Sequence, residues 1–233
     1  MSTLEYLSNI ELYFTSIKGI SAENIIIEGD EFMHITKVMR HSEGDEVYVT
    51  NGRGNIFVTT VTKLNKSFVE LLVQKTYNYE NKLKSIFFCI PRLKNPERFE
   101  FIIEKCTELG ITNFIIYDAE RAISKGNKID RWNKILLSAM KQSLRSYLPK
   151  ISLEGSIEKI YEKPGMKLVF DQNSKQDFEK SKCDLSFNSY FIFGPEGGLS
   201  ERELGLFSDF EKYNLADNRL RVETAVIKCA SLL

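Results

Sequence analysis

The sequence predicts an α/β protein in which a small N-terminal β barrel precedes a larger domain with a mostly parallel sheet. Up to about residue 75, short runs alternate apolar and polar residues, the pattern of half-buried strands. From Ser85 onward, apolar strands alternate with amphipathic helices, which predicts parallel strands covered by helices on both faces. Residues 76–84 (TYNYENKLK) fit neither period. We therefore predict two domains, 1–75 and 84–233, joined by this polar stretch.

The barrel is predicted from five short strands and one helix. Asn51-Gly52 is a turn signal between two of the strands. Residues 30–39 interrupt the strand pattern, because Phe32, Ile35 and Met39 are spaced for one helical face and acidic residues open the segment. The predicted strands are 11–14, 24–27, 45–50, 55–64 and 67–74.

The second domain opens with a strand, a helix and a strand. SIFFCI, from Ser85, is followed by a helix that Gly110 ends, and then by NFIIY at 113–117. The apolar face of that helix is formed by Phe99, Ile102, Ile103, Cys106 and Leu109. This order predicts a β-α-β unit with parallel strands.

Further helices and strands complete the predicted sheet. A helix over 131–147 carries one apolar stripe that includes Trp132, and Pro149 ends it. Ser200 and Glu203 form the S-x-x-E capping box of a helix over 200–207. A last helix spans 223–232. Strands are predicted near 167–170, 189–193 and 213–216.

Composition excludes several classes of protein. The 233 residues are 42% hydrophobic and 27% charged, which is typical of a globular chain and not of a disordered one. Glu5 and Glu11 lie where a signal peptide needs basic and apolar residues, and no uncharged run approaches twenty residues. Four cysteines without a CxxC pair, and two histidines, favour neither a metal site nor a disulfide framework. We expect a cytoplasmic protein without a membrane segment.

Charge is balanced overall but divided unevenly. The chain has 32 basic and 32 acidic residues. Residues 1–80 hold 7 basic and 11 acidic side chains, 82–150 hold 14 and 7, and 151–233 hold 11 and 14. The basic middle is either the solvated face of ordinary helices or a surface that binds a polyanion, and charge counting alone favours neither.

Three loops follow the C-terminal predicted strands, and ligands of open parallel sheets bind at such places. The loop from Phe193 to Ser200 (FGPEGGLS) has three glycines, so its backbone can turn sharply and approach a ligand closely. It matches neither a P-loop nor a dinucleotide fingerprint, and a tight turn without a ligand is the alternative. The loop over 214–225 carries Arg219 and Arg221, either as solvated residues or as cationic donors for an anion. The loop over 170–173 is weak evidence alone.

Several of these strings resemble one family. GPEGGLSERE, NRLRVETA, EKCTELG at 104–110 and AMKQSLRSYLP at 139–149 resemble the RsmE family of 16S ribosomal RNA uridine methyltransferases. HITKVMR at 34–40, EGD at 43–45 and NGRG at 51–54 match the family's first domain, so the resemblance covers nearly the whole chain. It implies a PUA-like barrel that helps to hold RNA, a SPOUT domain with a deep C-terminal trefoil knot that binds S-adenosylmethionine, and a homodimer.

The resemblance places the cofactor against the three loops already singled out. Ala216, Asp217 and Asn218 stand where many relatives carry a Gly-Pro-Arg run, and Arg219 replaces an aliphatic residue, so contacts there are less secure. The implied cofactor-binding residues are Phe170, Asp171, Phe193, Gly194, Pro195, Gly197, Gly198, Leu215, Leu220, Arg221, Thr224 and Ala225.

The implied reaction is methyl transfer to N3 of a uridine, whose proton must leave while negative charge spreads over O2 and O4. Glu223 is a candidate base and Arg221 a candidate charge stabiliser, because they are adjacent in the third loop. Glu196 is a second candidate base, or it caps the following helix. No metal is expected.

The RNA partner is 16S ribosomal RNA, expected within the small ribosomal subunit, and the target base has to leave its stack. Two alternatives stay open: a related enzyme acting on another RNA, and a ribosome-assembly factor that binds RNA without catalysis. The residues that we expect to contact RNA are Lys37, Arg40, Arg53, Arg92, Lys94, Arg98, Lys141 and Arg145.

Overall fold

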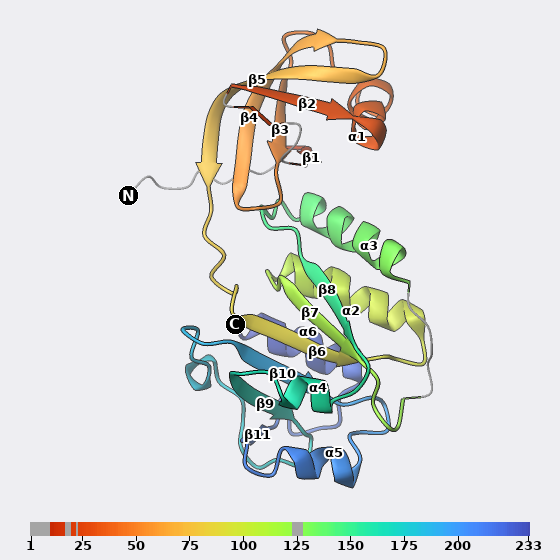
Figure 1. The fold of residues 1–233 in the computed structure, drawn as a ribbon, viewed down its shortest axis with the longest axis vertical. Coiled ribbons are helices and arrows are strands. Elements are labelled where there is room, and N and C mark those ends of the chain that lie inside the picture. The colour runs from red at the N-terminus through yellow and green to blue at the C-terminus, as the bar shows by residue number, and fades with distance from the viewer. Residues whose placement is uncertain (1–9, 17–19, 22, 123–127) are drawn as a thin grey trace. The chain divides into compact units, whose positions relative to one another are not determined.

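The computed structural model describes residues 10–16, 20–21, 23–122 and 128–233 (Figure 1), so Glu5 lies outside the described residues. The chain forms two compact units, one of residues 1–81 with 140–148 and the other of residues 82–139 with 149–233. Residues 140–148, which the sequence places in the second domain, thus group with the first unit. No helix in the described part of the chain is long and apolar enough to cross a membrane.

The first unit is a curled five-stranded sheet in the order β1-β3-β4-β5-β2, with β1 and β2 at its edges. In the described residues the predicted barrel takes the form of this curled sheet, in which the Thr15 hydroxyl after β1 donates to the Ile26 carbonyl of β2 at 3.3 Å. β1 runs parallel to β3, and the other neighbours are antiparallel. Alternate residues such as Ile25 and Ile27 are buried, as the period of two requires. The strands are β1 (Leu12–Phe14), β2 (Asn24–Glu28), β3 (Glu46–Thr50), β4 (Asn55–Leu64) and β5 (Phe68–Asn78).

The helix predicted over 30–39 is present in two parts. α1 (Gly29–Met33) continues into a π-helical turn, His34–Val38. Phe32 and Ile35 are buried as predicted, but Met39 is 46% exposed. The wider winding of the π turn rotates the residues that follow it away from the α-helical face, so the predicted apolar stripe ends before Met39.

The helix predicted over 131–147 ends earlier than expected. α3 covers Ile129–Gln142, and Leu144 takes a left-handed conformation with φ 55°. The amide of Arg145 donates to the Met140 carbonyl at 2.9 Å, which closes the helix end. The chain then pairs with the β3–β4 turn of the first unit: the Gly54 amide donates to the Ser146 carbonyl at 2.9 Å. Tertiary hydrogen bonds therefore overrode the helical period.

The second unit contains a six-stranded sheet in the order β11-β9-β10-β6-β7-β8. Every neighbouring pair is parallel, which confirms the predicted parallel α/β fold. β8 was not predicted, because KISLE is only partly buried and lacks a continuous apolar run. The strands are β6 (Ile86–Pro91), β7 (Asn113–Tyr117), β8 (Lys150–Glu154), β9 (Met166–Phe170), β10 (Ser189–Phe193) and β11 (Lys212–Tyr213).

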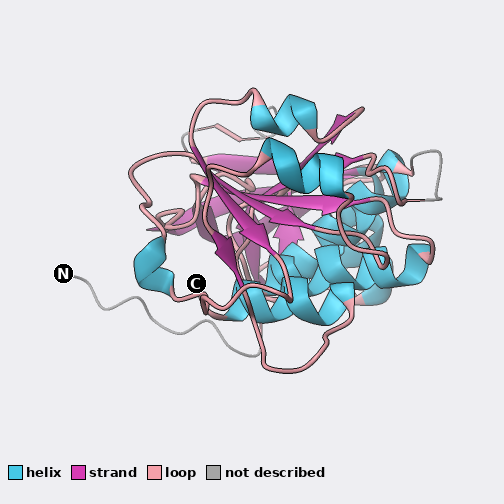
Figure 2. Cartoon of the chain, turned by 90° about the horizontal axis from the view of Figure 1, so that it is seen from below, coloured by secondary structure: helices cyan, strands magenta, loops and turns pink. Residues whose placement is uncertain are grey.

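Helices cover both faces of this sheet (Figure 2). On one face, Phe88 and Ile90 of β6 pack with α2 (Pro96–Glu108), α3 and α6 (Val222–Ser231). On the other face, Cys89 of β6 packs with α4 (Glu158–Tyr161) and α5 (Glu201–Leu206). Successive residues of one strand thus serve two apolar cores, which leaves the ends of the strands as the open positions.

Gly54 tests how tightly residues 140–148 are held by the first unit. Its φ is +103°, and an added Cβ would lie 2.4 Å from the Tyr147 hydroxyl oxygen and 2.9 Å from the Tyr79 carbonyl oxygen. We expect Gly54→Ala to lower the free energy of unfolding by about 2–4 kcal/mol, measured by urea denaturation. Gly44→Ala is the matched control, since Gly44 has φ +95° and nothing within 4 Å. Equal losses in the two variants would contradict the predicted close packing at Gly54.

Candidate functional site

A cavity of about 820 Å³ opens at the carboxyl ends of β9, β10 and β11. Its walls are the loops that follow these three strands, the first turn of α6, and two arginines from elsewhere, Arg98 and Arg121. The sheet order brings the three strand ends to one edge, so segments far apart in the sequence share one cavity.

The loop after β10 presents backbone to this cavity. A turn is closed by the Gly198 amide, which donates to the Pro195 carbonyl at 2.8 Å, and Gly198 has φ +72°. An added Cβ at Gly194 would lie 3.1 Å from the Leu199 backbone nitrogen. The loop is thus packed against itself, and a side chain at Gly194 would push it open. We call residues 194–199 the glycine loop.

Two side chains from the β7 region bond to the backbone of the glycine loop or to Phe193 directly before it. The Tyr117 hydroxyl donates to the Phe193 carbonyl at 2.6 Å, and Tyr117 is fully buried, which raises its pKa well above the ordinary value. Arg121 Nη1 donates to the carbonyls of Gly197 at 3.0 Å and Leu199 at 3.3 Å. The sequence analysis missed both residues. Their position at the end of the NFIIY strand, beside β6 in a parallel sheet, was the available signal.

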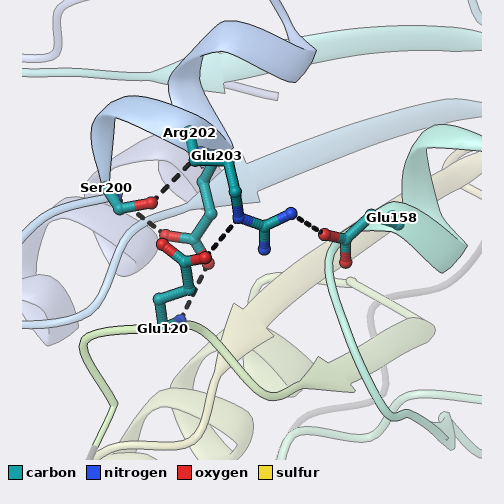
Figure 3. Close-up of polar contacts among 5 residues, drawn as sticks. All are labelled: Glu120, Glu158, Ser200, Arg202 and Glu203. Atoms are coloured by element: carbon teal, nitrogen blue, oxygen red, sulfur yellow. Dashed lines mark hydrogen bonds and ion pairs between the residues drawn. The ribbon is translucent and has the colours of Figure 1, made fainter.

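A buried carboxylate fixes the helix that follows the glycine loop (Figure 3). Glu203 is 1% exposed and accepts hydrogen bonds from the amides of Ser200 at 2.8 Å and Glu120 at 2.9 Å. The Ser200 hydroxyl accepts from the Glu203 amide in return, so the predicted capping box is confirmed. Because one Glu203 oxygen also binds the Glu120 amide, the capping box ties α5 to the loop after β7.

An exposed arginine adds a second connection in the same region. Arg202 pairs with Glu120 and, at 2.5 Å, with Glu158 of α4 (Figure 3). The pKa of Glu158 is lowered to about 2, chiefly by the Ser156 hydroxyl, then by its own backbone amide and by Arg202. These contacts lie outside the cavity wall and orient the elements that carry it.

The loops after β9 and β11 brace each other. The Asp171 amide donates to the Tyr213 carbonyl at 3.0 Å, and the Asn214 amide donates to the Gln176 carbonyl at 2.7 Å. The Asn214 side-chain oxygen accepts from the amides of Leu215 at 2.8 Å and Ala216 at 3.2 Å. Both loops therefore keep a fixed shape next to the glycine loop.

The cavity wall carries charges of both signs. Its basic residues are Arg98, Arg121, Arg219 and Arg221, and its acidic residues are Asp171, Glu196 and Glu201. Among the residues that the structure describes, no three His, Cys, Asp or Glu side chains form a group that could hold a metal ion. The site is suited to a ligand that has both charged and apolar parts, because Phe170, Phe193 and Leu220 also line it.

Most of the residues that were predicted to bind the cofactor lie together in the structure. Thr224 is the exception: it is exposed on α6, whose residues Val222 and Ala225 face the cavity instead. Of the candidate catalytic residues, Glu196 and Arg221 line the cavity and Glu223 does not. The predicted residues that line it are Phe170, Asp171, Phe193, Gly194, Pro195, Gly197, Gly198, Leu215, Leu220, Arg221 and Ala225.

The residues expected to contact RNA have different surroundings. Lys37, Arg40 and Arg53 of the first unit are exposed, and Lys94 of the second unit is exposed as well. The others are engaged within the protein. Arg92 pairs with Asp118 at 2.5 Å, Lys141 with Glu31 at 2.6 Å, Arg98 lies 3.5 Å from Glu223, and Arg145 also has a partner.

The fold and the site define an α/β protein whose ligand cavity is built from the loops at the carboxyl edge of a parallel sheet. A family model described as an RNA methyltransferase domain matches residues 80–233, and one described as an RNA methyltransferase PUA domain matches residues 27–74. The chain therefore belongs to this family of RNA methyltransferases, which confirms the family resemblance seen in the sequence.

Individual relatives agree with this assignment. Ribosomal RNA small subunit methyltransferase E of Bacillus subtilis is 29% identical over 91% of this chain and 90% of its own length. The enzyme of the same name from Aquifex aeolicus is 27% identical over 90% of this chain and 93% of its own. The crystal structure of a probable rRNA methyltransferase from Porphyromonas gingivalis matches 95% of each chain with 25% identity and a TM-score of 0.82.

A solved structure of one such protein also holds a ligand. Ribosomal RNA small subunit methyltransferase E from Neisseria gonorrhoeae, solved with S-adenosylmethionine bound, matches 95% of each chain with a TM-score of 0.82. Its identity to this chain is 23%, so the likeness establishes the shared fold.

Tyr117 offers a direct test of how the glycine loop is held. Tyr117→Phe removes the donor to the Phe193 carbonyl, and we expect the free energy of unfolding to fall by about 1–3 kcal/mol, because that buried carbonyl loses its side-chain partner. Tyr161→Phe is the control, since Tyr161 is 43% exposed, and we expect it to change stability by less than about 0.5 kcal/mol. Unfolding in urea measures both. A Tyr117 variant as stable as the wild type would show that this bond does not hold the loop.

Proposed function

We propose that this protein transfers a methyl group from S-adenosylmethionine to N3 of a specific uridine in 16S ribosomal RNA of the small subunit. The observation that carries the proposal is the cavity at the ends of β9, β10 and β11, formed by the glycine loop in a chain of the RNA methyltransferase family. The named relatives, which are small-subunit methyltransferases, support ribosomal RNA as the substrate.

The residues of the cavity fit this cofactor. Gly194, Gly197 and Gly198 line the cavity and have no side chains, so the polar edges of a nucleoside can approach the backbone closely, and Phe170 and Leu220 supply apolar walls for its rings. The wall also carries both arginines and carboxylates, which match the carboxylate and ammonium of an amino acid moiety. We propose that the predicted residues of the three loops that line the cavity bind the cofactor, and that Thr224, which is exposed on α6, does not.

The chemistry that the bound cofactor supplies is an electrophilic methyl group on a sulfonium. In the transfer, the carbon–sulfur bond breaks as the bond from carbon to N3 forms, and the N3 proton passes to a base. The protein has to align the three atoms, exclude water and receive this proton. Glu196 lines the cavity and is the carboxylate that we propose as the base, while Arg221 supplies positive charge from the third loop.

The first unit is proposed to hold the RNA. Lys37, Arg40 and Arg53 are exposed on it, as phosphate contacts require, and a PUA domain model matches residues 27–74. Lys94 is the exposed basic candidate on the second unit. We expect Lys141 and Arg92 to hold the fold, because both are ion-paired within the protein.

Two further properties of the family are proposed for this chain. Residues 174–178 run beside 212–214, with the Phe178 amide donating to the Asn214 carbonyl at 3.0 Å, and we propose that this crossing belongs to a C-terminal trefoil knot. We also propose that the protein is a cytoplasmic homodimer. Light scattering, which measures the mass of the particle in solution, tests the dimer. The proposed substrate, a ribosomal subunit, places the reaction in the cytoplasm.

The test of the function uses small subunits from a strain that lacks this protein. After incubation with purified protein and S-adenosylmethionine, mass spectrometry of the 16S RNA is expected to find one new N3-methyluridine. A methyl group on another base or another RNA would favour the alternative, a related enzyme that acts on another RNA. Absence of both methylation and cofactor binding would favour an assembly factor.

Gly194 tests the cofactor site separately from catalysis. We expect Gly194→Ala to weaken S-adenosylmethionine binding by at least about 10-fold in calorimetry, because the added Cβ presses on the Leu199 amide and reshapes the loop. Gly205→Ala is the matched control: it lies in α5 with nothing within 4 Å of its Cβ, and alanine favours a helix. We expect unchanged affinity in that variant. Full affinity in Gly194→Ala would place the cofactor elsewhere.

A further inference from the structure

Two helix N-termini bring an arginine and a glutamate together at the edge of the cavity. Arg98 lies in the first turn of α2 and Glu223 in the first turn of α6. Arg98 Nε is 3.5 Å from Glu223 Oε1. The two helices pack through one core that includes Ile102 and Val226, so the pair joins two elements that are held together over their length.

The two members of the pair differ in their access to the cavity. Arg98 lines the cavity, and its side chain is 35% exposed. Glu223 is absent from the cavity wall, and its side chain is 13% exposed. Its neighbours Val222 and Ala225 face the cavity, so Glu223 points from α6 toward α2. Of the pair, the arginine is therefore the member that a ligand in the cavity can reach.

Electrostatics explains why this carboxylate depends on Arg98. Glu223 Oε2 is buried and has no hydrogen-bond partner among the described residues. A mostly buried carboxylate without a counter-charge is strongly unfavourable, so the guanidinium and the N-terminus of α6 are what stabilise it. In return, the carboxylate attracts the guanidinium and restrains its position at 3.5 Å. A guanidinium has five N–H donors that can bind a ligand.

The other arginines of the cavity are less suited to act on a reacting base. Arg121 donates to two carbonyls of the glycine loop. Arg219 and Arg221 lie in the exposed segment before α6. Arg98 instead rises from a helix of 13 residues whose N-terminus is capped by Asn95. A charge on such a rigid element needs little rearrangement when charge develops in the ligand.

We propose that Arg98 is a catalytic residue that stabilises the negative charge on the uridine carbonyl oxygens as N3 loses its proton, and that Glu223 is its positioning residue. The assignment rests on the proposed function. It fits a base whose N–H lies between two carbonyls, because loss of that proton spreads the charge onto two oxygens that a guanidinium can bind. The proton itself goes to the base, and Arg98 stays protonated throughout.

The test compares single-turnover methyl transfer by Arg98→Ala, Arg98→Lys and Glu223→Gln over a range of pH. We expect Arg98→Ala to slow transfer by about 100-fold, Arg98→Lys to recover part of that loss, and Glu223→Gln to slow it by about 10-fold. S-adenosylmethionine affinity is expected to stay within about 2-fold of the wild type in all three. Arg131→Lys is the matched control. Arg131 lies outside the cavity and donates at 2.7 Å to Glu100 of α2, the helix that carries Arg98, so we expect full activity in this variant.

Two readouts separate this role from a structural one. Without Arg98 the uridine anion is less stable, so the rate is expected to keep rising at pH values where the wild-type rate has levelled off. Small subunits reconstituted with RNA that carries 5-fluorouridine, whose N3–H is more acidic, are expected to restore part of the activity of Arg98→Ala. Thermal unfolding identifies a variant that fails to fold, and Arg98→Lys then replaces Arg98→Ala in both readouts.

Several outcomes would overturn the assignment. An equal loss at every pH and with both RNAs would make Arg98 purely structural. A loss confined to cofactor affinity would assign Arg98 to the cofactor. A larger loss in Glu223→Gln than in Arg98→Ala, with the pH dependence abolished, would make Glu223 the base. A wild-type protein that methylates no uridine at N3 would instead overturn the proposed function, and the assignment with it.

Discussion

The site depends on one constraint: the glycine loop must keep its backbone open to the cavity while the peptide groups behind it are satisfied. Tyr117 and Arg121 meet this constraint by binding the Phe193 carbonyl and two loop carbonyls, and Glu203 meets it by binding the Glu120 amide. All of these bonds join β7 or its following loop to the β10–α5 connection. The cavity therefore owes its shape to contacts behind the loop, and a ligand meets a surface that is already arranged.

The carboxylates near the site are also held by specific donors. Two carboxylates near the site, the buried Glu203 and the mostly buried Glu223, have specific partners, because Glu203 binds backbone amides and Glu223 faces Arg98. Burial of such groups is unfavourable alone, so their positions are set by the donors that surround them. This separates carboxylates that hold the site from Glu196, which is exposed at the cavity wall and which we propose as the base.

Features of the fold that depend on neighbouring residues in the chain were predicted from the sequence. The parallel sheet, the capping box of Ser200 and Glu203, and the grouping of three loops at one edge followed from apolar periods and strand order. Signals failed where long-range contacts decide. α3 ends at Gln142 because residues 146–148 pair with the β3–β4 turn, and β8 forms at a sheet edge from a weakly apolar run. Arg98 reaches the cavity because α2 packs against α6, which no spacing along the chain reveals.

The central claim is that the three loops form the cofactor site of an RNA methyltransferase, with Arg98 facing the reacting base. A crystal structure of the protein with S-adenosylmethionine tests it most directly. We expect the ligand to lie against the backbone of residues 194–198, between the loops after β9 and β11, with its methyl group directed toward the open side that Arg98 borders. A ligand bound at another place on the protein, or a methyl group directed away from Arg98, would contradict it.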